Sequence, residues 1–118
     1  ISDAHEGLKA AVAKVLKASV RDYDVVCRFG GEEFAILLPE TTLAQAYERA
    51  ELIRKTFENS LIDAGADRIK INVSIGIAEY SPAMPHFSAL IKAADDALYQ
   101  AKLKGRNKVV AYTSATSR

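Results

Sequence analysis

The stretch that decides the fold is Arg-Phe-Gly-Gly-Glu-Glu-Phe at residues 28–34. Before the glycines, Val25, Cys27 and Phe29 alternate with Val26 and Arg28, and a continuous apolar run follows at residues 34–38. Gly30 and Gly31 between two such runs predict a β-hairpin with a two-residue loop, because both central positions of that turn require a positive φ. We therefore expect an antiparallel pair of strands over residues 24–38.

The same turn is also a candidate site. Glycines have no Cβ, so a phosphate can approach their backbone N–H groups closely, and a nearby carboxylate can hold a divalent cation against that phosphate. Glu32 and Glu33 follow the glycines, but successive strand residues point to opposite faces, so only one of the two can face a given metal ion. An ordinary turn with acidic residues that keep it soluble fits the local pattern as well.

Length and composition limit the possible function classes. The 118 residues suit one domain, and 49% of them are hydrophobic, which is enough for a packed core. The lone cysteine, Cys27, excludes an internal disulfide and fits a reducing compartment, and its place in an apolar strand predicts a buried structural thiol. A net charge of +1 argues against general polyanion binding. We expect a cytoplasmic domain that binds no nucleic acid and makes no direct membrane contact.

Hydrophobic periodicity predicts the remaining elements. Three amphipathic helices are expected at residues 7–20, 42–59 and 88–103, the second opened by a capping box of Thr42 and Gln45. Further strands are expected at 69–78 and 109–112, a polar connection at 63–68 and a frayed tail at 114–118. This order predicts an α+β domain with one antiparallel-containing sheet and its helices on one side.

Two charged pairs are candidate ligand sites. Arg21 and Asp24 stand three residues apart at a turn, where an arginine fork suits phosphate or a guanine edge and a carboxylate accepts from guanine N–H groups. The alternative is a weak ion pair at a solvated turn. Lys102 and Arg106 flank the end of the third helix and could grip a triphosphate, although cations are favoured at any helix C-terminus.

Other polar residues are expected to have no site function. Asp95 and Asp96 are about 100° apart on a helix and share a ligand poorly, so we expect them on a hydrated outer face. His5 and His86 have no partner at metal-ligand spacing.

Four motifs together resemble the GGDEF domain family, over residues 7–112. They are Gly-Gly-Glu-Glu-Phe at 30–34, Asn-Val-Ser-Ile-Gly-Ile at 72–77, the Ala-Asp to Ala-Lys segment at 94–102 and Gly-Arg-Asn at 105–107. The resemblance implies a ferredoxin-like, palm-type βαββαβ core of the nucleotidyl cyclase kind. Residues 1–118 would be a single, partial GGDEF domain, because the strand and helix with which the family begins are not recognisable here.

The family's enzymes are diguanylate cyclases, which join two GTP molecules into cyclic di-GMP and release two pyrophosphates. The resemblance implies a homodimer, a Mg²⁺ or Mn²⁺ cofactor, and catalysis by Glu32 and Glu33, with Glu32 as metal ligand and Glu33 in a supporting role. The nucleotide-binding residues that it implies are Gly30, Gly31, Lys102 and Arg106. Arg21 and Asp24 match the family's Arg-x-x-Asp site, where cyclic di-GMP binds and inhibits.

The chain departs from the family in two ways. The family's first strand, with an Asp metal ligand followed by Phe and Lys, is not visible, so we expect little or no turnover from these 118 residues alone. Leu52 stands where the family has a second inhibitory arginine, which predicts weaker product inhibition. A catalytically inactive domain that serves as a cyclic di-GMP receptor or a dimerisation module is the alternative. In either case we expect an upstream sensory or receiver domain, and the cytoplasmic part of a membrane-anchored sensor is one arrangement that fits.

Overall fold

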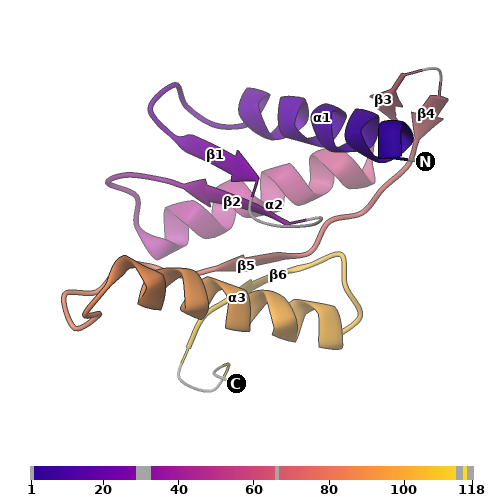
Figure 1. Cartoon of the computed structure of the whole chain (residues 1–118). Coiled ribbons are helices and arrows are strands. Elements are labelled where there is room, and N and C mark those ends of the chain that lie inside the picture. The colour runs from indigo at the N-terminus through magenta and orange to yellow at the C-terminus, as the bar shows by residue number, and fades with distance from the viewer. Residues whose placement is uncertain (1, 29–32, 66, 114–115, 117–118) are drawn as a thin grey trace.

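A computed structural model describes residues 2–28, 33–65, 67–113 and 116 of the chain. Helices and short strands alternate along it (Figure 1), which confirms the expected α+β class. The elements are α1 (Ser2–Ala18), β1 (Val25–Arg28), β2 (Phe34–Leu37), α2 (Leu43–Glu58), β3 (Ile62–Ala64), β4 (Asp67–Ile69), β5 (Ile75–Ile77), α3 (Phe87–Leu103) and β6 (Val109–Ala111). Within these described ranges, no helix has the length and apolar character needed to cross a membrane.

The predicted capping box opens α2. The Thr42 hydroxyl accepts a hydrogen bond from the Gln45 N–H at 3.2 Å, and the Gln45 side chain accepts one from the Thr42 N–H at 3.0 Å. Two N–H groups that have no partner within the helix are satisfied in this way. At the other end of the chain α3 stops at Gly105, as expected, where φ is +110°. All three predicted helices are present, and α1 begins at Ser2 rather than at residue 7.

The strands form three separate two-stranded ladders instead of the expected single sheet. β1 and β2 pair antiparallel, β3 and β4 pair antiparallel, and β5 and β6 pair parallel. Residues 63–68, expected to be a polar connection, contribute to the β3–β4 hairpin. Only Ile75–Ile77 of the predicted strand 69–78 lies in the β5–β6 ladder. Alternation places side chains on two faces, but a strand also needs a hydrogen-bonding neighbour along its length, and residues 70–74 have none among the described strands.

The register of β1 and β2 corrects the predicted loop length. Arg28 lies opposite Phe34 and Cys27 opposite Ala35. A two-residue loop of Gly30 and Gly31 would instead place Arg28 opposite Glu33. The antiparallel hairpin is therefore confirmed, whereas the two-residue loop is wrong, because this register leaves an odd number of residues between the strands.

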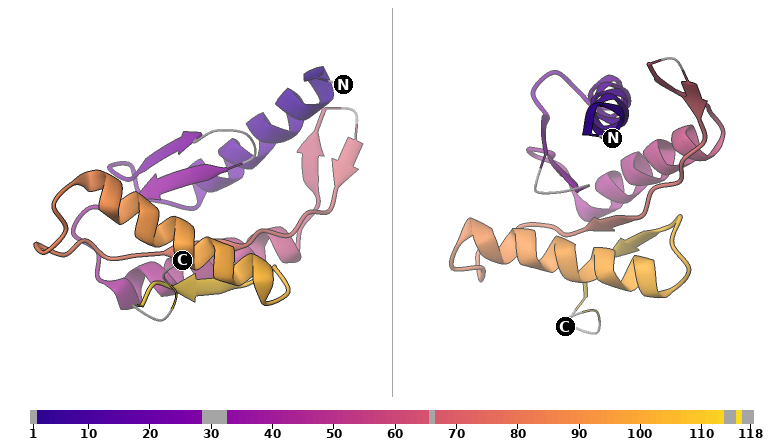
Figure 2. Two further views of the ribbon diagram at one scale, coloured as in Figure 1. Left: turned by 60° about the horizontal axis from the view of Figure 1, so that its bottom comes forward. Right: turned by 45° about the vertical axis from the view of Figure 1, so that its right-hand side comes forward.

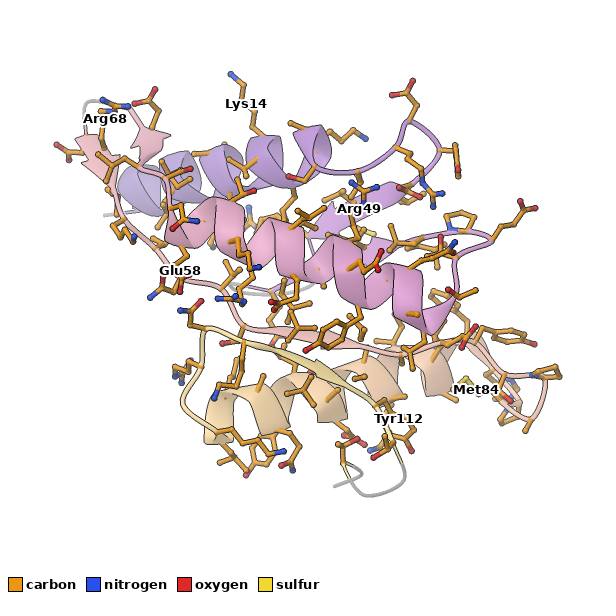
Figure 3. All side chains as sticks on the ribbon, turned by 180° about the vertical axis from the view of Figure 1, so that it is seen from behind. Lys14, Arg49, Glu58, Arg68, Met84 and Tyr112 are labelled. Carbon is orange, nitrogen blue, oxygen red and sulfur yellow. The ribbon has the colours of Figure 1, made fainter. Side chains whose placement is uncertain are left out.

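Two helices enclose the β5–β6 ladder. Both α2 and α3 contact these strands, and they lie on different sides of them (Figures 2 and 3), so the expectation of helices on one side only is wrong. On the α2 side, α1 joins a core of four buried residues, namely Leu16, Ile53, Phe57 and Ile62. Half-buried side chains of β1, β2 and β5 pack against that core, among them Val26, Phe34, Ile36 and Ile75.

The contact between α3 and β5 depends on Gly76. A Cβ built at this position would overlap the backbone carbonyl oxygen of Ala94 and the backbone nitrogen of Leu98. The facing residues of α3 are small and buried, with Ala97 and Ala101 fully enclosed. The backbones of helix and strand therefore approach more closely than any side chain on the strand would allow.

Cys27 is a second correction. Its side chain is exposed. Among the described strands β1 is hydrogen-bonded only to β2, and three of its four residues are exposed. The apolar residues around it in the sequence predicted a buried thiol, but burial requires a packing partner on that face.

We predict that Gly76→Ala lowers the free energy of unfolding by at least ~2 kcal/mol, because the new methyl group meets backbone atoms that cannot rotate away. Gly65→Ala is the matched control, since a Cβ there has no atom within 4 Å and only the φ of +78° is unfavourable, at about 1–2 kcal/mol. Urea unfolding of both variants measures the difference. Equal losses at the two positions would contradict the proposed close approach.

Candidate functional site

The end of α3 lies beside the start of β2. Lys102, in the last turn of α3, places its Nζ 3.6 Å from Oε2 of Glu33, the residue that leads into β2. Both side chains are partly exposed, at 37% and 43%. Two residues predicted to serve one nucleotide site are thus adjacent in space although they are far apart in the sequence. The contact also occupies Glu33, the carboxylate expected in a supporting role.

Three of the predicted site residues, Gly30, Gly31 and Glu32, lie outside the described residues, so their predicted roles remain predictions. The structure describes what flanks them. Arg28 is the last residue of β1 and Phe34 is the first residue of β2. Glu33, which precedes Phe34, lies next to Lys102.

Arg106, the other predicted phosphate ligand, is exposed in the turn after α3. The N–H of Arg106 donates to the carbonyl of Ala101 at 2.9 Å, which closes the helix in a Schellman motif with Gly105 at its left-handed position. Arg106 and Asn107 continue in the left-handed region, with φ of +65° and +47°. This conformation costs a residue with a Cβ about 1–2 kcal/mol, and asparagine tolerates it better than arginine does.

Arg21 and Asp24 converge on each other. Nε and Nη2 of Arg21 donate to the two carboxylate oxygens of Asp24, both at 3.1 Å, and the Arg21 backbone N–H donates to the same carboxylate at 2.8 Å. The guanidinium also donates to the Thr41 hydroxyl at 2.7 Å and lies 4.5 Å from the centre of the Tyr23 ring. The Asp24 side chain is fully buried. The pair is therefore a bidentate ion pair with a buried carboxylate rather than a weak ion pair at a solvated turn.

The hydrogen bonds from Arg21 hold the pKa of the Asp24 carboxyl below its ordinary value, against the opposing effect of burial. The positive charge of Arg49 acts in the same direction. A buried carboxylate at this position is therefore charged throughout the neutral range.

A pocket of about 230 Å³ opens beside this pair. Its lining comes from Arg21, the end of the hairpin and one face of α2, namely Leu38, Thr41, Gln45, Glu48, Arg49 and Leu52. Sequence reasoning missed Arg49, which stands one helical turn before Leu52 on the same face. Its Nη1 donates to the Ser19 carbonyl at 3.2 Å, so its side chain extends from α2 toward the loop after α1 (Figure 3). The i, i+3 spacing to Leu52 is the signal that could have identified it.

A second group that the sequence did not reveal surrounds Asn107. Its side-chain amide donates to Glu58 at 2.6 Å and accepts from Arg54 at 3.3 Å, both on α2. Its backbone N–H donates to the Ser74 hydroxyl at 3.1 Å. Only a folded structure brings these four residues together, because they are spread over three separate segments.

Asp95 and Asp96 do not share the predicted hydrated face. Asp96 is 2% exposed, and Nζ of Lys92 lies 2.9 and 3.1 Å from its two carboxylate oxygens. Asp95 is half-buried. The expectation fails for Asp96 because the Lys92 side chain at i−4 supplies the opposite charge that lets a carboxylate be buried. His86 is the N-cap residue of α3 and makes no side-chain capping hydrogen bond.

The side chains that the structure describes include no group of three or more His, Cys, Asp or Glu residues arranged to hold a metal ion. A Mg²⁺ site in a nucleotide enzyme needs only one or two carboxylates, because phosphate oxygens and waters complete the coordination. The carboxylates of Glu32 and Glu33 are hard oxygen donors, the kind of ligand that suits Mg²⁺ or Mn²⁺.

We predict that Asp24→Asn destabilises the domain at neutral pH and much less in acid. A folded-state pKa below the unfolded value gives stability that is complete above about pH 4 and is lost as the pH falls through the folded-state pKa. The measurement is the urea midpoint of both proteins at several pH values, with Asp22→Asn as the exposed control. A difference between wild type and Asp24→Asn that stays constant down to strongly acid pH would contradict this.

The chain is similar to known proteins over most of its length. Residues 6–108 match the family "Diguanylate cyclase, GGDEF domain". Diguanylate cyclase A of Treponema denticola is 38% identical over 98 residues, which cover 83% of this chain and 26% of that protein. Response regulator PleD of Caulobacter vibrioides is 40% identical over 97 residues, which cover 80% of this chain and 21% of PleD. The chain thus spans about a quarter of the length of these relatives.

Solved structures of GGDEF domains are similar to this chain as well. The active GGEEF domain of a diguanylate cyclase from Vibrio cholerae superposes with a TM-score of 0.79 at 28% identity, covering 92% of this chain and 69% of that one. The GGDEF domain of DgcB from Caulobacter crescentus, in complex with c-di-GMP, gives a TM-score of 0.76 at 31% identity, covering 86% and 60%. The fold, the spacing of the motifs and the matched length lead to one conclusion: this chain belongs to the diguanylate cyclase GGDEF family.

Proposed function

We propose that the protein containing this domain condenses two GTP molecules into cyclic di-GMP with release of two pyrophosphates. The observation that carries the proposal is the pairing of Lys102 with Glu33. It sets a cation suited to phosphate beside Glu33, which follows the two glycines and Glu32 in the sequence. The relatives named as diguanylate cyclases support the reaction type.

Each residue has a role that its chemistry fits. In each transfer a ribose 3′-oxygen forms a bond to the α-phosphorus of the other nucleotide, while the bond from that phosphorus to the pyrophosphate oxygen breaks. The Gly30–Gly31 turn would lie against the phosphates, and Lys102 and Arg106 would balance the charge of the leaving pyrophosphate. The pairing with Glu33 holds the Lys102 ammonium group at this end of the hairpin before nucleotide enters.

Glu32 is the residue assigned to hold Mg²⁺ or Mn²⁺, with Glu33 in support. The metal ion, when bound, lowers the pKa of the attacking hydroxyl and neutralises charge on the α-phosphate. Carboxylate oxygens beside phosphate are the donors that such ions prefer.

The reaction joins two nucleotides that are each bound to one domain, so the active form is proposed to be a homodimer. The similarity to Response regulator PleD, of which this chain covers 21%, supports an upstream sensory or receiver domain that controls the encounter. A cytoplasmic location follows from the use of GTP.

We predict that Glu32→Gln in the full-length protein reduces cyclic di-GMP formation at least ~100-fold, because a neutral amide is a poor ligand for a hard cation. The assay follows cyclic di-GMP and pyrophosphate from GTP with Mg²⁺. Glu79→Gln, which changes an acid in the loop after β5, is the control and should retain activity. Unchanged synthesis by Glu32→Gln would refute the assignment.

A second function, as a receptor for cyclic di-GMP, is favoured by a separate observation. Arg21, Arg49 and the buried Asp24 stand around or beside the pocket of about 230 Å³. Two guanidinium groups suit a phosphodiester or a guanine edge, and Tyr23 offers an exposed ring next to Arg21. The similar GGDEF domain of DgcB, which was solved in complex with c-di-GMP, supports this ligand. In an active cyclase, binding of cyclic di-GMP at this pocket would inhibit the enzyme. In a catalytically inactive domain, the same binding would be the function of the domain as a receptor.

We predict that Arg49 supplies the second cation that Leu52 does not. Arg49→Ala should weaken cyclic di-GMP binding about tenfold, the loss of one charge-assisted hydrogen bond, while Arg21→Ala should abolish it. Calorimetry with the full-length protein measures both. Lys55→Ala is the control, because Lys55 is an exposed cation on the same helix outside the pocket. Equal affinities for wild type and Arg49→Ala would show that Leu52 leaves the site with a single arginine.

A further inference from the structure

The turn after α3 holds three consecutive residues in the left-handed region, Gly105, Arg106 and Asn107. Glycine adopts this conformation freely, and a single left-handed residue is enough to end a helix. Arg106 has no such freedom and is exposed, so packing of its own side chain does not impose the conformation. Beyond the hydrogen bond from its own N–H to Ala101, the contacts that hold Arg106 in place come from its neighbours.

Asn107 provides those contacts. Oδ1 accepts from Arg54 at 3.3 Å, Nδ2 donates to Oε2 of Glu58 at 2.6 Å, and the backbone N–H donates to the Ser74 hydroxyl at 3.1 Å. Both ends of the amide and the backbone donor are therefore used at once. Figure 3 shows Glu58 at the end of α2 beside the segment that leads from α3 to β6.

The partners of Asn107 are themselves fixed. Arg54 forms two further hydrogen bonds with Glu51, at 2.8 and 3.2 Å, and its Nη1 donates to Glu58 at 3.3 Å. The hydrogen bond from Asn107 is the largest of the effects that lower the pKa of the Glu58 carboxyl, ahead of the charge of Arg54. Glu58 is thus a charged acceptor at neutral pH, and charge-assisted hydrogen bonds are the stronger kind.

We propose that Arg54, Glu58 and Asn107 form a positioning network that holds the Arg106 guanidinium ready for the β- and γ-phosphates of a nucleoside triphosphate. The inference rests on the proposed function, because it takes Arg106 as a phosphate ligand. The network touches no substrate. It fixes the backbone dihedral angles on the C-terminal side of Arg106, while the Schellman hydrogen bond to Ala101 fixes the N-terminal side.

A positioning role differs from a purely structural one in what it affects. A network that only held α2 against the turn would change stability and would weaken every ligand alike. A network that directs Arg106 affects the outer phosphates, and it does so only while Arg106 is present. The lysine on the helix side, Lys102, should not share this dependence, because it precedes the strained residues and contacts Glu33.

The experiment measures calorimetric affinity in the full-length protein for 3′-deoxy-GTP with Mg²⁺, a ligand that lacks the attacking hydroxyl, and for GMP. Glu58→Ala should weaken 3′-deoxy-GTP about tenfold and GMP less than about twofold. Glu58→Gln keeps an acceptor for Asn107 and should remain within about twofold of wild type. Glu79→Ala is the control, because Glu79 is an exposed acid in the loop after β5 and belongs to no contact of this network.

Combination with Arg106→Ala separates the two explanations. In the Arg106→Ala background, Glu58→Ala should cause less than about a twofold further loss, whereas in the Lys102→Ala background the tenfold loss should persist. Ser74→Ala, which removes only the acceptor for the Asn107 N–H, should show the same selectivity and serves if Glu58→Ala does not fold.

Three results would overturn the inference while leaving the proposed function intact. They are full 3′-deoxy-GTP affinity in folded Glu58→Ala and Ser74→Ala, an equal loss for GMP, or an undiminished loss in the Arg106→Ala background. Failure of the wild-type protein to bind 3′-deoxy-GTP at all would instead refute the proposed function, and the inference with it.

Discussion

The close approach of α3 to β5 at Gly76 is the constraint on which the rest of the structure depends. Because no side chain separates helix from strand, α3 lies along the β5–β6 ladder on its small residues, with Ala97 and Ala101 enclosed. The position of the helix axis fixes where its last turn ends. Lys102 therefore reaches Glu33 near the closed end of the β1–β2 hairpin, and the turn that follows α3 meets the end of α2. A contact between backbones determines the placement of charged side chains some distance away.

One ladder connects the two candidate sites. β1 begins directly after Asp24 and ends at Arg28, so the Arg21 pocket lies at the open end of the hairpin and the glycine turn at its closed end. Val25 pairs with Leu37 near the pocket, and Arg28 pairs with Phe34 near Glu33. The hydrogen-bonded register ties both ends together. Leu38 and Thr41 follow β2 directly in the chain, so the strand that starts next to Glu33 leads to the pocket at its other end.

Local signals in the sequence predicted local structure well. Thr42 with Gln45 predicted the start of α2, Gly105 predicted the end of α3, and two apolar runs around the glycines predicted the hairpin. Each of these depends on residues that lie within a few positions of one another.

Several of the failures concern which surface of an element is covered by another part of the chain. Asp96 was expected in water because helical spacing does not reveal which face is covered, and Cys27 was expected inside because an apolar neighbourhood does not guarantee a packing partner. Arg49 belonged to no motif, and Asn107 was noted only as the last residue of Gly-Arg-Asn at 105–107. Their contacts depend on the approach of α2 to the loop after α1 and to the turn after α3. The Arg21–Asp24 pair, three residues apart in the sequence, bears on the proposed binding of cyclic di-GMP. A buried carboxylate holds Nε and Nη2, so the orientation of the guanidinium is set before any ligand arrives, and little side-chain entropy remains to be lost on binding.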